Sequence, residues 1–502
     1  MQPDTIAPAK GLVLIAGAGP VGLTMAAELA RYGVPVRIIA KAAGRSETSK
    51  ALVLWSRTLE LLERGIGAAP FVEAGCKLHG VNIVAGDAVI GRIRMNGVES
   101  PYPYGLMLPQ SETERLLEGG LASQGTTVER QVELVSFTQG EDGVQAVLRH
   151  GDGREESVAA DWLVGCDGAH SAVRHGVGAT FAGKTMDSDW MLADVHLHGY
   201  PFPDSEAAVY WHRDGVLVVF PISPGRYRVL ADLPPSGLPR SPAPTLEQVQ
   251  AVMQRRGPPG MVAHDPVWLA GFNINGRKVA RYRWGRVFLA GDAAHIHSPA
   301  GGQGMNTGMQ DAFNLAWKLA LVIHGTCADE VLDSYGPERS AVGDAVLKAA
   351  DRLTTVATLR NPVAQGARNL VAHLVLGLGP VQHAVAETIT ELATGYRESP
   401  LNGQALPGAG PRPGARLPPT EAQAPPGTGA TPRFALFAQP SIAVDELIGA
   451  FPDLLEPAPR PPLRADTLWL VRPDGYVACS ATDTAAIAAY LRRIMPSGGP
   501  DA

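Results

Sequence analysis

The chain has 502 residues, 45% of them hydrophobic, which is enough for two or three domains with sizeable cores. Its 43 basic and 49 acidic residues give a net charge of −6 without a dense basic run, which argues against a nucleic acid partner. The four cysteines lie far apart and form no CxxC pair, which fits a reducing compartment and argues against a zinc site. We therefore expect a cytoplasmic protein without a metal.

The N-terminal region is predicted to form a strand, a glycine turn, a helix and a second strand. The strands are expected at Leu12 to Ala16 and Val36 to Ala40, with the helix at Pro20 to Tyr32. The run from Gly11 to Ala30 is apolar enough to resemble a signal peptide or a membrane span, but two glycines and a proline interrupt it. We therefore predict a soluble βαβ unit and no membrane partner.

The turn carries a GxGxxG motif. Gly17 permits a tight turn, Gly19 lets the backbone approach a pyrophosphate, and Gly22 allows the helix to pack closely on the strand. The helix N-terminus, where Pro20 stands, provides N–H groups for the phosphates. The motif predicts a dinucleotide site.

The acidic residue that usually ends the second strand is missing. A Rossmann fold normally has Asp or Glu there, which binds the adenosine ribose, whereas this strand ends in Ala40. Losing such a hydrogen bond weakens cofactor binding roughly tenfold to a hundredfold. Glu47 or a water molecule is a candidate replacement.

Further along the chain, the sequence texture changes twice. A helix is expected at Glu112 to Leu121, and a short buried strand at Trp162 to Gly165. From about Asp187 to Leu233 the alternating apolar pattern predicts an inserted sheet domain. A short apolar strand of the kind found in dinucleotide-binding domains is expected again at Arg286 to Ala290, and an amphipathic helix begins near Met309.

Two later motifs each place an aspartate just after a short strand, where it can hold a sugar or polyol hydroxyl. The first is GCDGAHSAVR, which contains Asp167. The second begins GDAAH, contains Asp292, and continues through a glycine-rich loop to Asn306. The helix after that loop has its positive end directed at the same region, which suits a reduced ring system.

With these three motifs, the chain resembles the class A flavoprotein aromatic hydroxylases, the family of p-hydroxybenzoate hydroxylase, phenol hydroxylase and polyketide hydroxylases. The resemblance runs from Gly11 to about Glu338. It implies an α/β fold with a Rossmann-like FAD-binding domain of the p-hydroxybenzoate hydroxylase type, formed by residues 1–180 and 275–395. A β-sheet substrate domain would occupy residues 181–274, a Pro/Gly-rich linker or extended wrap residues 396–432, and a thioredoxin-like domain residues 433–502. That last domain lacks a CxxC pair, so disulfide chemistry is not expected there.

The resemblance also implies the residues that contact FAD. The first motif is expected at the pyrophosphate, Asp292 and Gln110 at the ribityl chain, and the loop after Pro299 beside the isoalloxazine ring. Asp167 is expected to serve both FAD and the nicotinamide cofactor. The expected FAD-binding residues are Gly17, Gly19, Pro20, Gly22, Lys50, Gln110, Asp167, Asp292, Pro299, Gly302, Gly304, Met305 and Asn306.

For the reaction, the resemblance implies NAD(P)H- and O2-dependent monooxygenation. NAD(P)H binds transiently and reduces FAD, and O2 then forms a flavin C4a-hydroperoxide that transfers oxygen to an aromatic substrate. No second GxGxxG predicts a permanently bound nicotinamide. The expected substrate pocket contains Pro299, His297, Tyr104 and Phe220. Tyr102 is a further candidate, and His295 of GDAAH is expected to be structural rather than a base.

The sequence is compatible with several alternative activities. The same scaffold supports Baeyer–Villiger or epoxidising chemistry, and an FAD dehydrogenase that does not activate O2 is a further reading. Ala40 also leaves room for a weak or non-catalytic flavin-binding protein. The apolar strand at Val216 to Phe220 favours a hydrophobic phenol or polyketide over a small benzoate. Because the family contains monomers, dimers and larger assemblies, a homodimer is one expectation.

Overall fold

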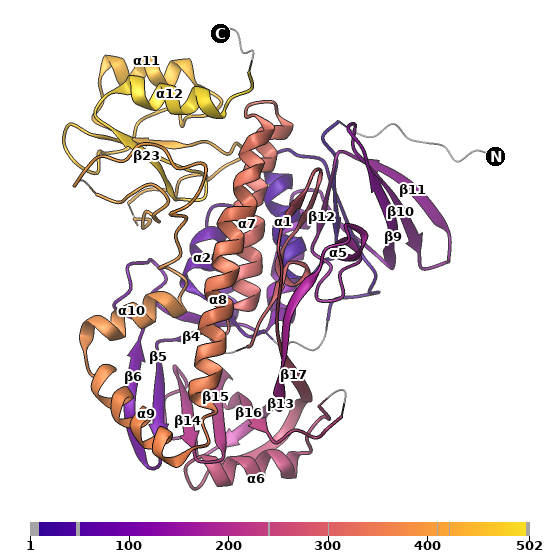
Figure 1. Cartoon of the computed structure of the whole chain (residues 1–502), viewed down its shortest axis with the longest axis vertical. Coiled ribbons are helices and arrows are strands. Elements are labelled where there is room, and N and C mark those ends of the chain that lie inside the picture. The colour runs from indigo at the N-terminus through magenta and orange to yellow at the C-terminus, as the bar shows by residue number, and fades with distance from the viewer. Residues whose placement is uncertain are drawn as a thin grey trace.

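The computed structural model describes residues 10–46, 51–238, 241–299, 301–408, 410–420 and 422–497. Figure 1 shows a central region with two long helices, a large sheet at the lower end, and a C-terminal region at the upper end. The fold is mixed α/β.

The central region is built on a six-stranded sheet of short strands, buried at its centre and half-exposed at its two edges. The strands are β1 (Val13–Ala16), β2 (Val36–Ala40), β8 (Val128–Arg130), β12 (Trp162–Gly165), β18 (Arg283–Trp284) and β19 (Val287–Leu289). Their order is β18-β19-β12-β1-β2-β8, and β1 pairs in parallel with both β2 and β12. Because both faces of its centre are covered, β1, β12 and β19 are continuous buried apolar runs rather than alternating ones. The predicted βαβ start is confirmed.

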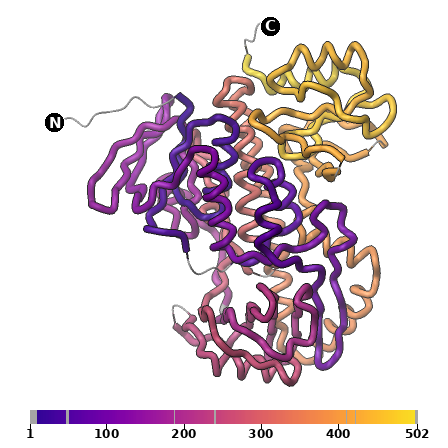
Figure 2. Tube along the Cα trace, turned by 180° about the vertical axis from the view of Figure 1, so that it is seen from behind, coloured from indigo at the N-terminus to yellow at the C-terminus, as the bar shows by residue number. Residues whose placement is uncertain are grey.

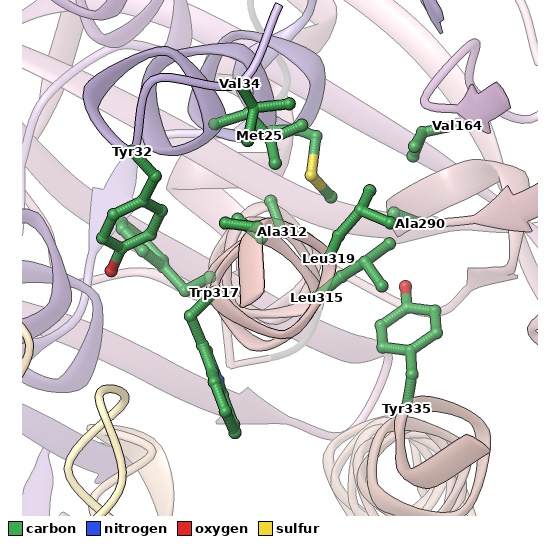
Figure 3. Close-up of a cluster of buried hydrophobic side chains, with 14 of the residues drawn as sticks. Met25, Tyr32, Val34, Val164, Ala290, Ala312, Leu315, Trp317, Leu319 and Tyr335 are labelled. Atoms are coloured by element: carbon green, nitrogen blue, oxygen red, sulfur yellow. The ribbon is translucent and has the colours of Figure 1, made fainter. Parts of the chain in front are cut away.

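Two helices form the core of this region, α1 (Pro20–Arg31) and α7 (Gly304–Ile323). Almost every side chain of α7 is buried, so it is a central helix rather than a surface one. Figure 3 shows its buried side chains between α1, the sheet and a further helix that carries Tyr335. Small residues such as Ala312 allow α1 and α7 to approach closely.

The lower region is an eight-stranded sheet. Its strands are β5 (Gly80–Ala85), β6 (Ala88–Arg94), β13 (Phe181–His198), β14 (Glu206–His212), β15 (Gly215–Ser223), β16 (Arg226–Leu233), β17 (Val262–Val279) and β20 (His295–Ile296). Their order is β20-β17-β13-β16-β15-β14-β5-β6. The sheet therefore extends beyond the expected bounds of 181–274, because β5 pairs in parallel with β14 over a long sequence separation. No local pattern signals such a pairing.

The two faces of this sheet have different partners. Leu217 and Val219 face α6 (Leu246–Arg256), and their neighbours Val216 and Val218 face the opposite side with Trp190 and other apolar residues. This alternation follows the two-residue period of a strand. The second face is covered by α8 (Tyr335–Ala357), α9 (Pro362–Val375) and α10 (Gly379–Ile389) (Figure 1).

Shorter elements complete the central region. Two three-stranded sheets contain β3 (Val53–Leu54), β4 (Cys76–Leu78) and β7 (Gly105–Met107), and β9 (Val132–Gln139), β10 (Val144–His150) and β11 (Glu155–Ala160). The remaining helices are α2 (Ser56–Leu62), α3 (Ala69–Ala74), α4 (Gln110–Ser123) and α5 (Ala172–Gly176), with 3-10 turns η1 (Gly291–Ala293) and η2 (Asp329–Ser334). Among the described residues, no single helix is both long and apolar enough to cross a membrane.

The C-terminal region contains β21 (Ala435–Phe437), α11 (Ile442–Ala450), β22 (Leu468–Val471), β23 (Val477–Ala481) and α12 (Thr484–Ile494). It lies beside the upper part of the central region in both views (Figures 1 and 2). Arg472 from this region pairs with the fully buried Glu338 of α8 at 2.6 Å. The described part of the Pro/Gly-rich stretch packs against the protein as an extended wrap, because Arg416 pairs with the buried Glu60 and Leu417 N–H donates to Gly475.

Candidate functional site

The glycine turn after β1 has the shape that the motif predicts. Gly17 has a φ of +102°, and a Cβ there would lie 2.3 Å from the carbonyl oxygen of Cys166. A Cβ on Gly22 would lie 1.9 Å from the Gly17 carbonyl oxygen. At Gly19, in contrast, no heavy atom of the described residues lies within 4 Å of the Cβ position. The protein itself therefore requires glycine at 17 and 22, whereas Gly19 opens onto free space just before Pro20 begins α1.

Three loops meet at the carboxyl ends of neighbouring strands. Cys166 N–H donates to Ala16 O at 2.8 Å, and Ala290 N–H donates to Gly165 O at 3.0 Å. These bonds place the glycine turn, Asp167 and Asp292 at one edge of the sheet. Ligands bind at such an edge in open α/β sheets.

Asp167 has one carboxylate oxygen engaged and one available. Its Oδ2 accepts from Val173 N–H at 3.1 Å, and its buried Oδ1 has no hydrogen-bond partner among the described residues. Burial raises the pKa of this carboxyl above its usual value, despite hydrogen bonds that favour the charged form. A buried acceptor without a partner is costly, so a ligand hydroxyl at Oδ1 fits this site.

Asp311 of α7 holds the GDAAH loop in place through hydrogen bonds. This buried carboxylate accepts from Gly291 N–H at 2.9 Å, contacts His295 Nε2 at 2.8 Å and accepts from Arg339 Nε at 2.6 Å. Although burial opposes ionisation, Arg339 and His295 lower the pKa of Asp311. His295 thus lies in a support network under the loop, while Asp292 is exposed at the sheet edge.

Asn306 and Trp55 hold Gly301 and Gly302, in the loop that precedes α7. Asn306 Nδ2 donates to Val53 O at 2.8 Å and to Gly302 O at 3.0 Å, and its Oδ1 accepts from Trp55 N–H at 2.8 Å. Trp55 Nε1 donates to Gly301 O at 3.0 Å. Because its side-chain amide is fully engaged in the protein, Asn306 positions the loop. A direct FAD contact at this loop would therefore come from backbone atoms and not from the Asn306 side chain.

The other predicted cofactor residues lie around this loop. Gly304 begins α7, and Met305 is half-buried against the core. Gln110 begins α4, its N–H donates to Ala51 O at 3.2 Å, and its Nε2 donates to Glu114 at 2.8 Å. Lys50 and Glu47 lie outside the described residues.

The His297 ring lies beside the loop, with one of its two nitrogens available to accept a hydrogen bond. Its Nδ1 donates to the carbonyl oxygen of Ser298 at 2.9 Å, which leaves Nε2 as an acceptor in the neutral ring. Nε2 is buried without a partner among the described residues, and a Cβ on Gly304 would lie 3.5 Å from it. Burial lowers the pKa of His297 to about 4, so the ring is neutral at physiological pH.

The three aromatic candidates for the substrate pocket, Phe220, Tyr104 and Tyr102, lie in different surroundings. Phe220 packs beside Trp55 and Ile222 in one apolar cluster. Tyr104 is buried next to His79 and directly precedes β7, where a Cβ on Gly105 would touch the Trp55 ring. Tyr102 instead donates its hydroxyl to Glu63 at 2.9 Å, at the surface.

A hollow of about 540 Å³ lies between β13, the end of β16 and the last turns of α8. We call it the α8 hollow. Its lining combines five hydroxyl side chains with two apolar and four charged ones. The hydroxyl side chains are those of Thr185, Ser188, Thr354, Thr355 and Thr358, the apolar ones those of Met186 and Pro235, and the charged ones those of Lys184, Asp232, Asp351 and Arg360. Thr354 also bonds the Ser298 hydroxyl at 2.9 Å, so the hollow adjoins the loop after GDAAH. Sequence reasoning did not find it, because the β13 and α8 residues that line it lie more than 150 positions apart.

Glu391, just after α10, is a buried carboxyl under the first turns of α7. It accepts from Thr307 Oγ1 at 3.0 Å and from Gln310 Nε2. Burial raises its pKa from 4.5 to about 8, more than these donors lower it. A raised carboxyl pKa stabilises the fold fully below pH 4.5, and that stability is lost as pH rises towards 8.

Glu391→Gln is therefore expected to flatten the pH dependence of unfolding between about pH 5 and 8. Relative to the parent chain, the variant should gain stability with rising pH at up to about 1.4 kcal/mol per pH unit. Thermal melts of both proteins at pH 5, 6.5 and 8 measure the difference. An offset that is equal at all three pH values would contradict the assignment.

Ala40 occupies the position at which a Rossmann fold normally has the acidic residue that binds the adenosine ribose. Ala40 is buried at the end of β2 and pairs with Arg130, whose guanidinium contacts Glu118. Ala40→Glu restores the usual acceptor and is expected to tighten FAD binding about tenfold. Fluorescence titration of the apoprotein with FAD checks this, with Ala40→Gln as the uncharged control. Equal affinities for all three proteins would show that another group already fills this role.

Comparison with known proteins gives one consistent result. The family described as FAD binding domain matches residues 11–350. A 6-methylpretetramide 4-monooxygenase of Streptomyces rimosus is 39% identical over 82% of this chain and 74% of its own length. A flavin-dependent monooxygenase of Mycobacteroides abscessus is 34% identical over 96% of this chain and 100% of its own length. The structure of an anhydrotetracycline hydroxylase from Streptomyces rimosus aligns with a TM-score of 0.80 and 31% identity, covering 98% of this chain and 99% of that one.

The chain belongs to this FAD-binding family, and it is an FAD-dependent monooxygenase of the aromatic hydroxylase type. The resemblance inferred from the three motifs is confirmed.

Proposed function

We propose that this monooxygenase hydroxylates a polycyclic aromatic substrate that carries several oxygen atoms, with NAD(P)H as the reductant. The α8 hollow carries the proposal, because about 540 Å³ suits a ligand of several fused rings. Its hydroxyl side chains match a substrate with hydroxyl or carbonyl groups. Met186 and Pro235 in the wall of the hollow provide apolar surface for the rings.

The relatives support the same substrate class. One acts, by its name, on 6-methylpretetramide, and the solved structure is that of an anhydrotetracycline hydroxylase. The reaction consumes one NAD(P)H, one proton and one O2, and it places one oxygen atom in the product and the other in water. When bound, FAD takes a hydride from NAD(P)H and activates O2.

The residues of this chain bind and orient the reactants. The glycine turn and the N-terminus of α1 would hold the FAD pyrophosphate, with Asp167 Oδ1 and Asp292 accepting from hydroxyl groups of the cofactor. The loop from Pro299 to Gly302 would lie beside the isoalloxazine ring, and the positive end of α7 favours negative charge there. Phe220 and Tyr104 would help to exclude water on the substrate side.

His297 Nε2 would accept a hydrogen bond from a substrate hydroxyl. His297→Phe is then expected to raise the KM for a phenolic substrate about tenfold, whereas His297→Gln, which keeps an acceptor, should raise it less. For the parent enzyme, substrate affinity should stay level from pH 8 to pH 5 and weaken towards pH 4, where the ring protonates. Identical KM values for the parent and His297→Phe would exclude this contact.

We also assign the regions of the chain by what they would do. The six-stranded sheet with α1 and α7 would bind FAD, and the eight-stranded sheet would hold the substrate. The C-terminal region would be thioredoxin-like, since Phe434 and Phe437 form parallel bridges to Leu455 and Arg460 beside an antiparallel hairpin. This arrangement has a βαβ half followed by a ββα half.

The proposed substrate class is tested by binding and turnover. FAD-loaded protein is titrated with a tricyclic or tetracyclic phenol and, in parallel, with 4-hydroxybenzoate, while flavin absorbance and NAD(P)H oxidation are followed. We expect the polycyclic phenol to bind at least tenfold more tightly and to accelerate NAD(P)H oxidation. Preference for the benzoate would refute the assignment of the hollow. Product NMR separates ring hydroxylation from Baeyer–Villiger insertion, which opens or expands a ring.

A further inference from the structure

Helix α9 exposes an apolar face. Val363, Leu370 and Leu374 have 83%, 60% and 61% of their surface accessible, and Val371 of the same helix and Leu378, three residues after its end, are also exposed. These five residues form what we call the α9 face. Soluble monomers rarely display a contiguous aliphatic surface of this kind, so the face indicates an interaction site.

The orientation of α9 is fixed by two of its polar side chains, Gln365 and Arg368, which contact the body of the protein. Gln365 is buried and its Nε2 donates to the carbonyl oxygens of Arg213 at 3.2 Å and Leu359 at 2.5 Å. Arg368 donates to Val356 O at 3.0 Å, and its guanidinium lies 4.3 Å from the centre of the Trp211 ring. The helix therefore cannot bury its aliphatic residues by rotating without breaking these contacts.

The pattern of the α9 face suits another helix. Val363, Ala367, Leu370 and Leu374 are spaced by four, three and four residues, which is the spacing of a helix–helix seam. Between Asn361 and Ala386 the only Lys, Arg, Asp or Glu is Arg368, which is turned inward. Two copies of this face can therefore meet without bringing like charges together. A lipid surface, in contrast, selects basic residues around the apolar face.

We propose that the α9 face is the interface of a homodimer, in which α9 packs antiparallel against α9 of a second copy about a two-fold axis. Such self-complementary pairing is the commonest form of oligomer. The contact would also brace α8, because Arg368 joins α9 to the end of α8, whose last turns line the α8 hollow. The dimer does not depend on the substrate proposed above.

The mass of the FAD-loaded protein in solution tests the interface. Sedimentation velocity or light scattering should give twice the chain mass of 52.8 kDa at micromolar concentration. The pair Leu370→Asp and Leu374→Asp should give the monomer mass with FAD still bound. The control Val267→Asp, at an exposed aliphatic on β17, should remain a dimer. A monomeric parent protein, or a dimer that survives the paired change, would overturn the proposal.

Cross-linking tests the two-fold geometry. Leu370 lies near the middle of the seam, so Leu370→Cys should form a disulfide-linked dimer under mild oxidation, and Val267→Cys should not. Background is expected to be low, since Cys166, Cys327 and Cys479 are buried and Cys76 is only partly exposed. If Val267→Cys cross-links as readily as Leu370→Cys, the geometry is wrong. A monomeric parent protein that floats with phosphatidylglycerol vesicles would assign the face to a membrane instead.

Discussion

Replacing Gly19 by alanine is expected to weaken FAD binding at least about tenfold while the apoprotein stays folded. In the part of the chain that the structure describes, nothing lies within 4 Å of the position that the new methyl group would take, so the fold should tolerate it. In the proposed FAD site a pyrophosphate would approach the backbone at this position, and the methyl group would hold it away. Isothermal or fluorescence titration with FAD measures the affinity, and a thermal melt of the apoprotein measures the fold.

Gly17→Ala is the matched contrast. Its methyl group would meet the Cys166 carbonyl oxygen at 2.3 Å, and its positive φ disfavours any side chain. This variant should therefore lose apoprotein stability as well as FAD affinity. If Gly19→Ala binds FAD like the parent protein, the cofactor does not lie against this turn.

Replacing Asp311 by asparagine is expected to cost roughly 3–5 kcal/mol of stability, because it leaves the buried Arg339 without its charged partner. The loss should concentrate at the GDAAH loop, since Asp311 also accepts from Gly291 N–H and contacts His295. FAD affinity should therefore fall together with stability. Denaturant unfolding and FAD titration of the same preparations measure both effects.

The control for this change is Asp333→Asn. Asp333 pairs with Arg283 at 2.7 Å, but its side chain is 67% exposed, so its removal should cost no more than about 1 kcal/mol. Hydrogen exchange adds a local readout, because the amide of Gly291 should lose protection only in Asp311→Asn. A stability loss of the same size in both variants would contradict the supporting role of Asp311.

Much of the cofactor side could be predicted from the sequence because its signals are local. Gly17, Gly19 and Gly22 stand close together between a strand and a helix, and Asp167 follows a four-residue apolar strand. Each motif determines the backbone conformation of its own short segment, and the parallel sheet then brings the motifs to one edge. Asn306 was predicted from the same kind of local motif, and in the structure its side chain supports the loop.

The substrate side could not be predicted in the same way. Thr354 contacts Ser298 across 56 residues of sequence, and Thr185 and Ser188 line the same hollow from β13, whose sequence is that of an ordinary strand. Strands β5 and β6 join the large sheet through a long-range parallel pairing. Side chains brought together by such pairings have no shared local pattern, so only the folded chain identifies them.

Isotope labelling tests the central claim, that this chain is an FAD-dependent monooxygenase of aromatic compounds. FAD-loaded protein, NAD(P)H and the polycyclic phenol that binds most tightly are incubated under ¹⁸O2, and the product is analysed by mass spectrometry. We predict one ¹⁸O atom in the product for each NAD(P)H consumed in coupled turnover, with no label when the oxygen is supplied as H2¹⁸O. Substrate oxidation without ¹⁸O incorporation, sustained anaerobically by an artificial electron acceptor, would show a dehydrogenase and contradict the account.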